Sequence, residues 1–217
     1  MSPKFVDKEQ KIKEIAQAAL KLFSQKGYAG TNVGQIAKSA GIGKGTIYEY
    51  FETKEDIFIA AIMEWISQFE FQLSAHLEKI DDPVQRLFAV AEMTVKWADP
   101  LDPATTRLSL EILQQFLMEG GVIFKKRNLA IKIHDGLRRM VMNILLDGIS
   151  KGIFKSEIAR DAEKIANNLL ACLDGISLHS LLSRNDFDLK SQIDFYMQNL
   201  INGILIDSSA ISGSGAL

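Results

Sequence analysis

The stretch that decides the fold covers residues 31–54 and reads TNVGQIAKSAGIGKGTIYEYFETK. Apolar residues recur at helical spacing in its first half, which predicts a short helix over 33–40 with one buried face. Gly41 follows at the point where a helix commonly ends with a positive φ. Gly43 is a suitable cap for a second helix, which we expect over 44–50.

Two short helices joined by a tight glycine turn form a helix-turn-helix, and its second helix can enter the major groove of DNA. The same pattern also fits an ordinary helical hairpin inside a larger bundle. A buried bundle helix would carry Leu or Ala on its outward positions, whereas here they carry a lysine, a threonine and two tyrosines, which suit phosphates and base edges. We expect Thr31 to cap the first helix and to join a DNA-binding surface made of Thr31, Lys44, Gly45, Thr46, Tyr48, Tyr50 and Lys54.

The segment IAKSAGIGKGTIYEYFETKEDIF resembles the DNA-binding signature of the tetracycline-repressor (TetR) family. Its Ile-Ala pair, glycine turn, Gly-Thr-Ile-Tyr, Tyr-Phe and following lysine are in register with that pattern, and the match extends back to Ala19. Gly43 stands where the family usually has a serine, and Glu49 puts a negative charge in the recognition helix. These two departures bear on the operator sequence and not on the family.

Charge is unevenly distributed along the chain. The net charge is −2 at pH 7, but residues 1–54 hold nine lysines against five acidic residues, which leaves +4 there and −6 for the remainder. A basic head on an acidic body suits a DNA-binding domain attached to a domain that does not bind DNA. Because no arginine precedes Arg86, Lys44 is the candidate for reading guanine in place of arginine.

Composition predicts an all-α protein in the cytoplasm. Hydrophobic residues make up 47% of the chain and charged residues 24%, as in ordinary globular proteins, and no alternating β pattern is evident. No apolar run approaches the length of about 18 residues that a membrane span needs, and no signal peptide opens the chain. Cys172 is the single cysteine and is expected to be a small core residue. The three histidines match no metal-ligand spacing, so we expect no metal, no cofactor and no catalytic site.

The helical pattern predicts about nine helices in two domains. We expect a three-helix DNA-binding head over residues 1–53 and an effector-binding and dimerisation body over 54–217. Thr53, with Asp56 three residues on, forms a capping box that opens a long helix from the head into the body. Further helices are expected over 83–97 and 103–118, both opened by Asp-Pro pairs, and over 124–150, 162–183 and 189–207.

Large aromatic and methionine side chains are abundant in the middle helices. Core packing is their ordinary explanation. The resembled family keeps an effector pocket among the same helices, and such side chains suit apolar ligands. We therefore expect a pocket for a small apolar effector lined by Trp65, Phe69, Phe88, Trp97, Glu111, Gln115, Phe116 and His134.

The last two helices carry apolar residues at helical spacing, and Gly175 lies in the middle of the first of them. A glycine there costs about 1 kcal/mol relative to alanine, which close approach of another helix would explain. The resemblance implies that two such helices from each subunit form a four-helix dimer interface. We expect that interface to contain Leu169, Leu173, Gly175, Ile176, Met197, Leu200 and Ile204.

These features favour a homodimeric repressor that a small effector releases from a palindromic DNA operator. One alternative is a DNA-binding regulator that responds to no small molecule, its apolar body being core and partner surface. Another, of a different class, is a helical ligand-binding protein or enzyme with a vestigial head. The charge asymmetry and the outward Lys44, Thr46 and Tyr48 argue against the last.

Overall fold

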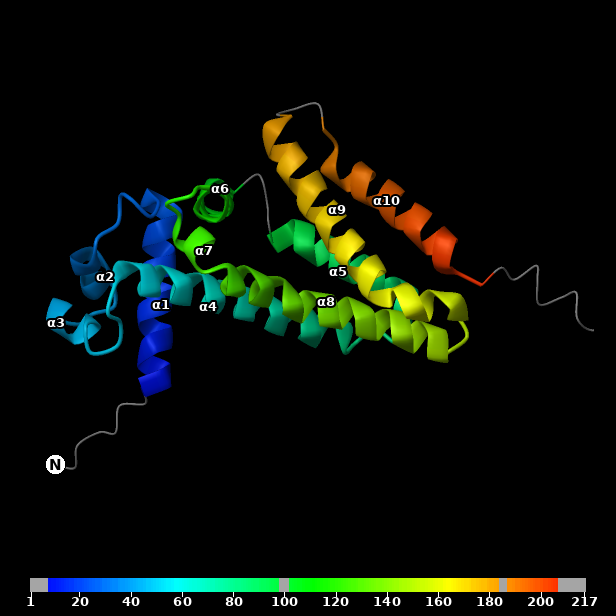
Figure 1. Ribbon diagram of the computed structural model, residues 1–217, viewed down its shortest axis with the longest axis horizontal. Helices are drawn as coiled ribbons and strands as arrows, with labels where there is room; N and C mark the ends of the chain where they lie inside the picture. The colour runs from blue at the N-terminus through cyan, green and yellow to red at the C-terminus, as the bar shows by residue number, and fades with distance from the viewer. Residues whose placement is uncertain (1–7, 98–101, 184–186, 207–217) are drawn as a thin grey trace, which may run out of the picture. The chain divides into compact units, whose positions relative to one another are not determined.

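The computed structural model describes residues 8–97, 102–183 and 187–206, with the side chains of 127–134 outside that description. These residues form ten α-helices and one 3₁₀ helix and contain no strand, so the all-α prediction is confirmed (Figure 1). The elements are α1 (Lys8–Lys26), α2 (Val33–Ser39), α3 (Lys44–Ile47), α4 (Lys54–Leu77), α5 (Pro83–Trp97), α6 (Pro103–Leu117), α7 (Val122–Lys125), α8 (Arg127–Ser150), η1 (Ser156–Asp161), α9 (Ala162–Leu182) and α10 (Leu189–Ile204).

The chain divides into two compact units. Unit 1 comprises Met1–Phe71 and Leu101–Ile133, and unit 2 comprises Gln72–Pro100 and His134–Leu217. Unit 1 therefore contains α6 and α7 in addition to the helix-turn-helix. The expected functional boundary between residues 53 and 54 lies inside unit 1, and it stays a prediction about where DNA binding ends.

Unit 1 is built around an aromatic cluster that joins α1 to α4. The Phe23 and Phe58 rings meet nearly at right angles with centroids 5.0 Å apart, and the Tyr28 ring lies 4.9 Å from Phe58. Ile36 of α2 and Ile47 of α3 are buried in the same core. Each edge-to-face aromatic pair contributes about 0.5–1.5 kcal/mol of stabilisation beyond that of burying its surface area. The cluster therefore stabilises the core on which α2 and α3 pack.

Most of the predicted helix ends are confirmed. Gly41, at the expected end of the first short helix, adopts a φ of +68°, which a residue with a side chain rarely takes, and Gly27 after α1 adopts +71°. Thr53 and Asp56 form the expected capping box, with the Thr53 N–H and hydroxyl both donating to the Asp56 carboxylate. Asp102 accepts from two backbone N–H groups at the start of α6.

The prediction that Thr31 caps α2 is wrong, because Asn32 occupies the cap. The Asn32 side chain accepts from the Gln35 N–H at 3.0 Å, and the Gln35 side chain accepts from the Asn32 N–H at 3.1 Å. Asn and Thr are both good caps, so neighbouring candidates could not be separated by residue type alone.

Three helix boundaries also differ from the prediction. The last helix was expected to reach residue 207, which lies outside the described residues, and it ends at Ile204. The second helix of the helix-turn-helix ends at Ile47 and not at residue 50. The expected helix over 124–150 is divided into α7 and α8 by a break at Lys126, whose φ of −116° and ψ of 56° are not helical. Helix ends depend on local hydrogen bonds that periodicity does not report.

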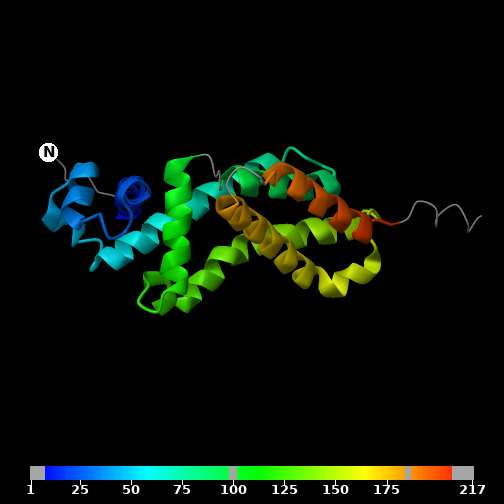
Figure 2. The same cartoon turned by 90° about the horizontal axis from the view of Figure 1, so that it is seen from above.

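Unit 2 contains α5, α9 and α10 packed on one another, and α9 and α10 lie side by side in both views (Figure 1 and Figure 2). The connector after α8 is fixed by Phe154, which is fully buried and pairs with Leu205 in an isolated antiparallel bridge. A Cβ at Gly148 would lie 2.1 Å from the Phe154 ring, so only glycine allows this close approach.

One described segment is long and apolar enough to cross a membrane by length and composition alone, contrary to the sequence-based expectation. It covers Ser156–Leu182, and 22% of its most apolar stretch is buried within the chain. In the structure the inner side of this segment packs on α5 and α10.

Candidate nucleic-acid interface

Helix α3 presents a short polar surface on a buried apolar anchor. Ile47 is fully buried beneath it, whereas Lys44 and Gly45 are exposed at its start. Tyr48 caps its end with 51% of its surface exposed, and Thr46 is half-buried. A rigid helix with outward hydrogen-bond donors has the form in which a helix-turn-helix addresses phosphates and base edges.

The helices of unit 1 that precede α4 carry several lysines. Lys11 and Lys13 are paired with Glu14 and Glu64 and are therefore partly neutralised. Exposed lysines without a salt bridge in the described part of the chain include Lys21, Lys26, Lys38 and Lys44. Lys38 on α2 was not among the residues expected to bind DNA, although its charge and its place in the helix-turn-helix could have identified it.

Two of the residues expected at the DNA surface have their polar groups engaged within the protein. The Thr31 side chain is only 1% exposed, and its hydroxyl donates to the Gly27 carbonyl at 2.9 Å. The Lys54 ammonium donates to the carbonyls of Tyr28 and Thr31 at 2.8 and 2.9 Å. In this structure both side chains are held by backbone carbonyls, and their contact with DNA stays a prediction.

The Lys54 ammonium is partly removed from solvent. Its ammonium lies 4.1 Å from the centre of the Tyr28 ring, where a cation–π interaction adds to the two hydrogen bonds. Desolvation by burial lowers the pKa of Lys54, although the nearby Glu111 carboxylate acts in the opposite direction. Burial, with smaller contributions from Glu55 and Glu111, raises the pKa of the Tyr28 phenol.

Tyr50 is half-buried and packs against the apolar core of unit 1. A tyrosine can bury its ring while its hydroxyl remains near the surface. Its expected contact with DNA stays a prediction, as do those of Lys44, Gly45, Thr46 and Tyr48.

Glu111 and Gln115 were expected to line an effector pocket, but their hydrogen bonds give them another role. Glu111 accepts from the Tyr28 N–H at 3.0 Å, and its second oxygen accepts from the Gln115 amide at 3.0 Å. Gln115 in turn accepts from the Val122 N–H at 2.9 Å. The two side chains thus connect α6 and α7 to the turn that follows α1.

The other residues expected at the pocket have varied positions. In unit 1, Phe69 is buried, Trp65 is half-buried and Phe116 is 45% exposed. Phe88 and Trp97, both half-buried, belong to α5 in unit 2. The His134 side chain lies outside the described residues. An effector site formed by these residues stays a prediction.

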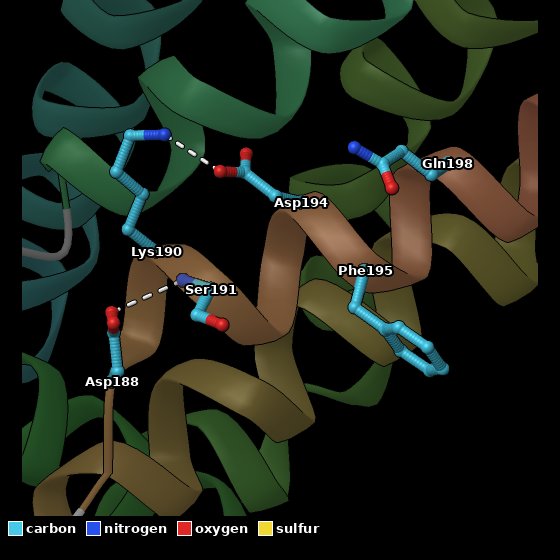
Figure 3. A pocket seen from close by; sticks show the side chains of 6 residues that line it. All are labelled: Asp188, Lys190, Ser191, Asp194, Phe195 and Gln198. Atoms are coloured by element: carbon cyan, nitrogen blue, oxygen red, sulfur yellow. Dashed lines mark hydrogen bonds and ion pairs between the residues drawn. The ribbon is translucent and has the colours of Figure 1, made fainter.

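A surface depression on α10 contains none of those residues. Its volume is about 410 Å³, it is open to solvent, and it is lined by Asp188, Lys190, Ser191, Asp194, Phe195 and Gln198 (Figure 3). Lys190 and Asp194 form an ion pair at 2.6 Å along its wall. Its open, charged walls differ from the enclosed apolar cavity that an apolar effector would need.

The residues expected at the dimer interface fall into two groups. Leu169, Leu173, Met197 and Ile204 are buried within the protomer and contribute to its own core, and their place in a dimer interface stays a prediction. Gly175 is exposed, and a Cβ there would meet no described atom outside its own stretch of helix within 4 Å, while Ile176 and Leu200 are half-buried. Periodicity identified the apolar residues of α9 and α10 but not which side of each helix faces inward.

A different set of apolar residues forms the outer face of α9 and α10. Leu178 and Leu182 follow Gly175 along α9 at intervals of three and four residues, and so lie on one side of it. Leu182 is 70% exposed and Phe195 of α10 is 68% exposed. We call Gly175, Leu178, Leu182 and Phe195 the outer apolar face.

The architecture of unit 1 defines a helix-turn-helix protein, and two families match the chain. "Bacterial regulatory proteins, tetR family" matches residues 15–61, and "BetI-type transcriptional repressor, C-terminal" matches residues 83–201, more than half of the chain. The chain belongs to the tetR family of bacterial regulatory proteins, and it is a DNA-binding transcriptional regulator.

Similar proteins of known function are also regulators. The fatty acid metabolism regulator protein of Bacillus subtilis (strain 168) is 24% identical over 211 residues, 91% of this chain and 97% of the relative. The regulator HbdR of Aromatoleum sp. (strain CIB) is 38% identical over 85 residues, which cover 39% of this chain and 36% of HbdR. The crystal structure of FadR from Bacillus subtilis in complex with stearoyl-CoA matches with a TM-score of 0.68 and 25% identity, covering 88% of this chain and 98% of that one.

Proposed function

We propose that this protein is a homodimeric repressor that an effector with an apolar chain releases from a palindromic DNA operator. The observation that carries the proposal is the surface of α3, where Lys44 and Tyr48 face outward above the buried Ile47. Tyr48 and Thr46 supply hydroxyls, and Lys44 and Lys38 supply cations for phosphates and base edges. Because its target is bacterial DNA, the protein acts in the cytoplasm.

The dimer forms through the outer apolar face of α9 and α10. Large exposed side chains grouped on adjacent helices are costly in water and typical of protein interfaces. A helix that packs on α5 and α10 with one side and on a second subunit with the other must be apolar on both. This accounts for the hydropathy of α9 without a membrane.

The two-fold axis of such a dimer supplies two recognition helices. Half-sites one helical turn apart, about 34–36 Å, suit a symmetric helix-turn-helix dimer. Joining two weak half-site contacts in one molecule raises affinity well above that of either contact.

The effector is proposed from the likeness to a fatty acid regulator and to the FadR structure with stearoyl-CoA. Trp65 and Phe69 of α4 supply apolar surface for such a ligand in unit 1, and Phe88 and Trp97 of α5 supply it in unit 2. Binding must favour the form of the protein with low DNA affinity, because a ligand shifts an equilibrium only by its differential affinity.

The test is a reciprocal binding measurement. The operator would first be selected from random-sequence DNA with the full-length protein, and its affinity measured by fluorescence anisotropy with and without stearoyl-CoA. We expect the ligand to weaken operator binding and saturating operator to weaken ligand binding by the same factor.

Stearic acid, which lacks the CoA group, is measured in the same way to show which part of the ligand the protein recognises. Equal operator affinity at all concentrations of both ligands would contradict the effector proposal while leaving DNA binding intact. Failure to select any operator would contradict the repressor proposal itself.

A further inference from the structure

The turn between α1 and α2 is held from two sides by residues outside the three-helix head. On one side the Lys54 ammonium of α4 binds the carbonyls of Tyr28 and Thr31. On the other side the Glu111 carboxylate of α6 accepts the Tyr28 N–H at 3.0 Å. The turn comprises residues 27–31 and leads directly into the Asn32 cap of α2.

The chain around this turn is shaped to admit the carboxylate. Gly27 has a φ of +71°, and a Cβ built on it would lie 2.8 Å from a Glu111 carboxylate oxygen. Glycine is therefore needed both for the backbone conformation and for the space that the carboxylate occupies. Next to this contact, Arg107 of α6 donates to the Gln25 carbonyl near the end of α1 at 3.0 Å.

The carboxylate is itself oriented by a second hydrogen bond. Gln115 donates to its other oxygen and accepts from the Val122 N–H, so α7 fixes the Gln115 side chain and Gln115 fixes Glu111. A hydrogen bond to an ionised group is stronger than one between neutral groups. The opposite charges of Glu111 and Lys54 also attract each other across the turn.

We propose that Glu111 is a positioning residue for DNA binding, through which α6 sets the position of the α1–α2 turn and hence of α2 and α3. The residue touches no DNA. Its effect on operator affinity comes from holding the turn that carries the Asn32 cap, so the number of phosphate contacts does not change when Glu111 is removed. This inference rests on DNA binding and does not depend on the proposed effector.

The experiment compares Glu111→Ala and Glu111→Gln with the wild-type protein on the selected operator over a range of salt concentrations. Loss of a hydrogen bond to a charged group corresponds to a weakening of about ten-fold. We expect Glu111→Ala to weaken binding by about that factor with the slope of log K against log[salt] unchanged, since the slope counts phosphate contacts. Glu111→Gln retains one acceptor oxygen and should restore part of the affinity.

Hydrogen exchange of the Tyr28 amide, followed by NMR in the full-length protein, reports on the turn directly. It should be faster in Glu111→Ala than in the wild type and intermediate in Glu111→Gln. Glu119→Ala removes an exposed carboxylate of the same unit and should change neither affinity nor exchange.

Wild-type operator affinity in Glu111→Ala, or unchanged Tyr28 exchange, would overturn the inference. A salt slope smaller by about one unit would also overturn it, because Glu111 would then act on a phosphate contact. If Glu111→Ala does not fold, Glu111→Gln decides between these outcomes. Absence of wild-type binding would instead contradict the DNA-binding function.

Discussion

Two lysines of the helix-turn-helix region illustrate how the same residue type serves different ends. Lys44 begins α3 with its side chain exposed, and Lys54 begins α4 with its ammonium on two backbone carbonyls and near the Tyr28 ring. Desolvating a lysine is costly unless hydrogen bonds and an aromatic face compensate it, and both are present at Lys54. Lys54 therefore stabilises the turn, while Lys44 remains available to DNA.

The two lysines should respond differently to substitution. Lys44→Ala should weaken operator binding and reduce the salt slope by about one unit, because one phosphate contact is lost. Lys54→Met keeps the apolar stem and should weaken binding while leaving the slope unchanged. Anisotropy titrations at several salt concentrations check both. A unit loss of slope in Lys54→Met would mean that the ammonium leaves the carbonyls and contacts DNA in the complex.

At the scale of the element, the start of α4 depends on one carboxylate. Asp56 accepts from the Thr53 hydroxyl at 2.7 Å and from Lys126 at 3.0 Å. The Thr53 hydroxyl first, and then Lys126, hold the pKa of the Asp56 carboxyl below its usual range. A carboxylate at a helix start also interacts favourably with the helix dipole.

The sign of the resulting pH dependence follows from linkage. Because the pKa of Asp56 is lower in the folded protein, the ionised carboxylate contributes stability above its unfolded pKa of about 3.9. That contribution is lost as the pH falls through the folded pKa. Asp56→Asn should thus lower the melting temperature at pH 7 and lower it progressively less as the pH decreases below about 4.

Thermal unfolding of the wild type and of Asp56→Asn between pH 7 and pH 3 measures the difference between their melting temperatures. Thr53→Ala removes the largest cause of the lowered pKa of Asp56. It should therefore also reduce the difference in melting temperature between neutral and acidic pH. If this difference in melting temperature is constant from pH 7 to pH 3, Asp56 stabilises α4 without a shifted pKa.

At the scale of the whole molecule, the described part of the single chain leaves an apolar surface exposed on α9 and α10. The outer apolar face of α9 and α10 exposes Leu178, Leu182 and Phe195, whereas the opposite sides of both helices are buried in unit 2. A second copy of the chain is the proposed cover.

Replacing Leu182 or Phe195 with Glu should convert the dimer to a monomer, because burying a carboxylate in an apolar interface is strongly unfavourable. Operator affinity should then fall by about 10²–10⁴, the gain that joining two binding modules can provide. Sedimentation velocity and anisotropy measure the two effects. Leu146→Glu, on a side chain of α8 that is 44% exposed, is the matched control and should leave the dimer intact. A persistent dimer in Leu182→Glu and Phe195→Glu would place the interface elsewhere.

Local sequence determined the helix-turn-helix and several of the helix ends of this protein. Positive φ at Gly41 follows from backbone sterics, and the box of Thr53 and Asp56 follows from hydrogen bonds between residues three apart, so residue type suffices to predict both. The family could be recognised for the same reason, because its signature is a local register of apolar, glycine and polar positions.

The tertiary structure alone decided what the polar side chains of unit 1 do. Glu111 meets Tyr28 across 83 positions of sequence, and Lys54 meets Tyr28 across 26. Neither contact has a periodic or compositional signal, so Glu111 resembled a pocket residue and Lys54 a DNA contact. The inward and outward sides of α9 were undetermined for a related reason: a helix that is apolar on both sides has no polar side to mark its exposed face.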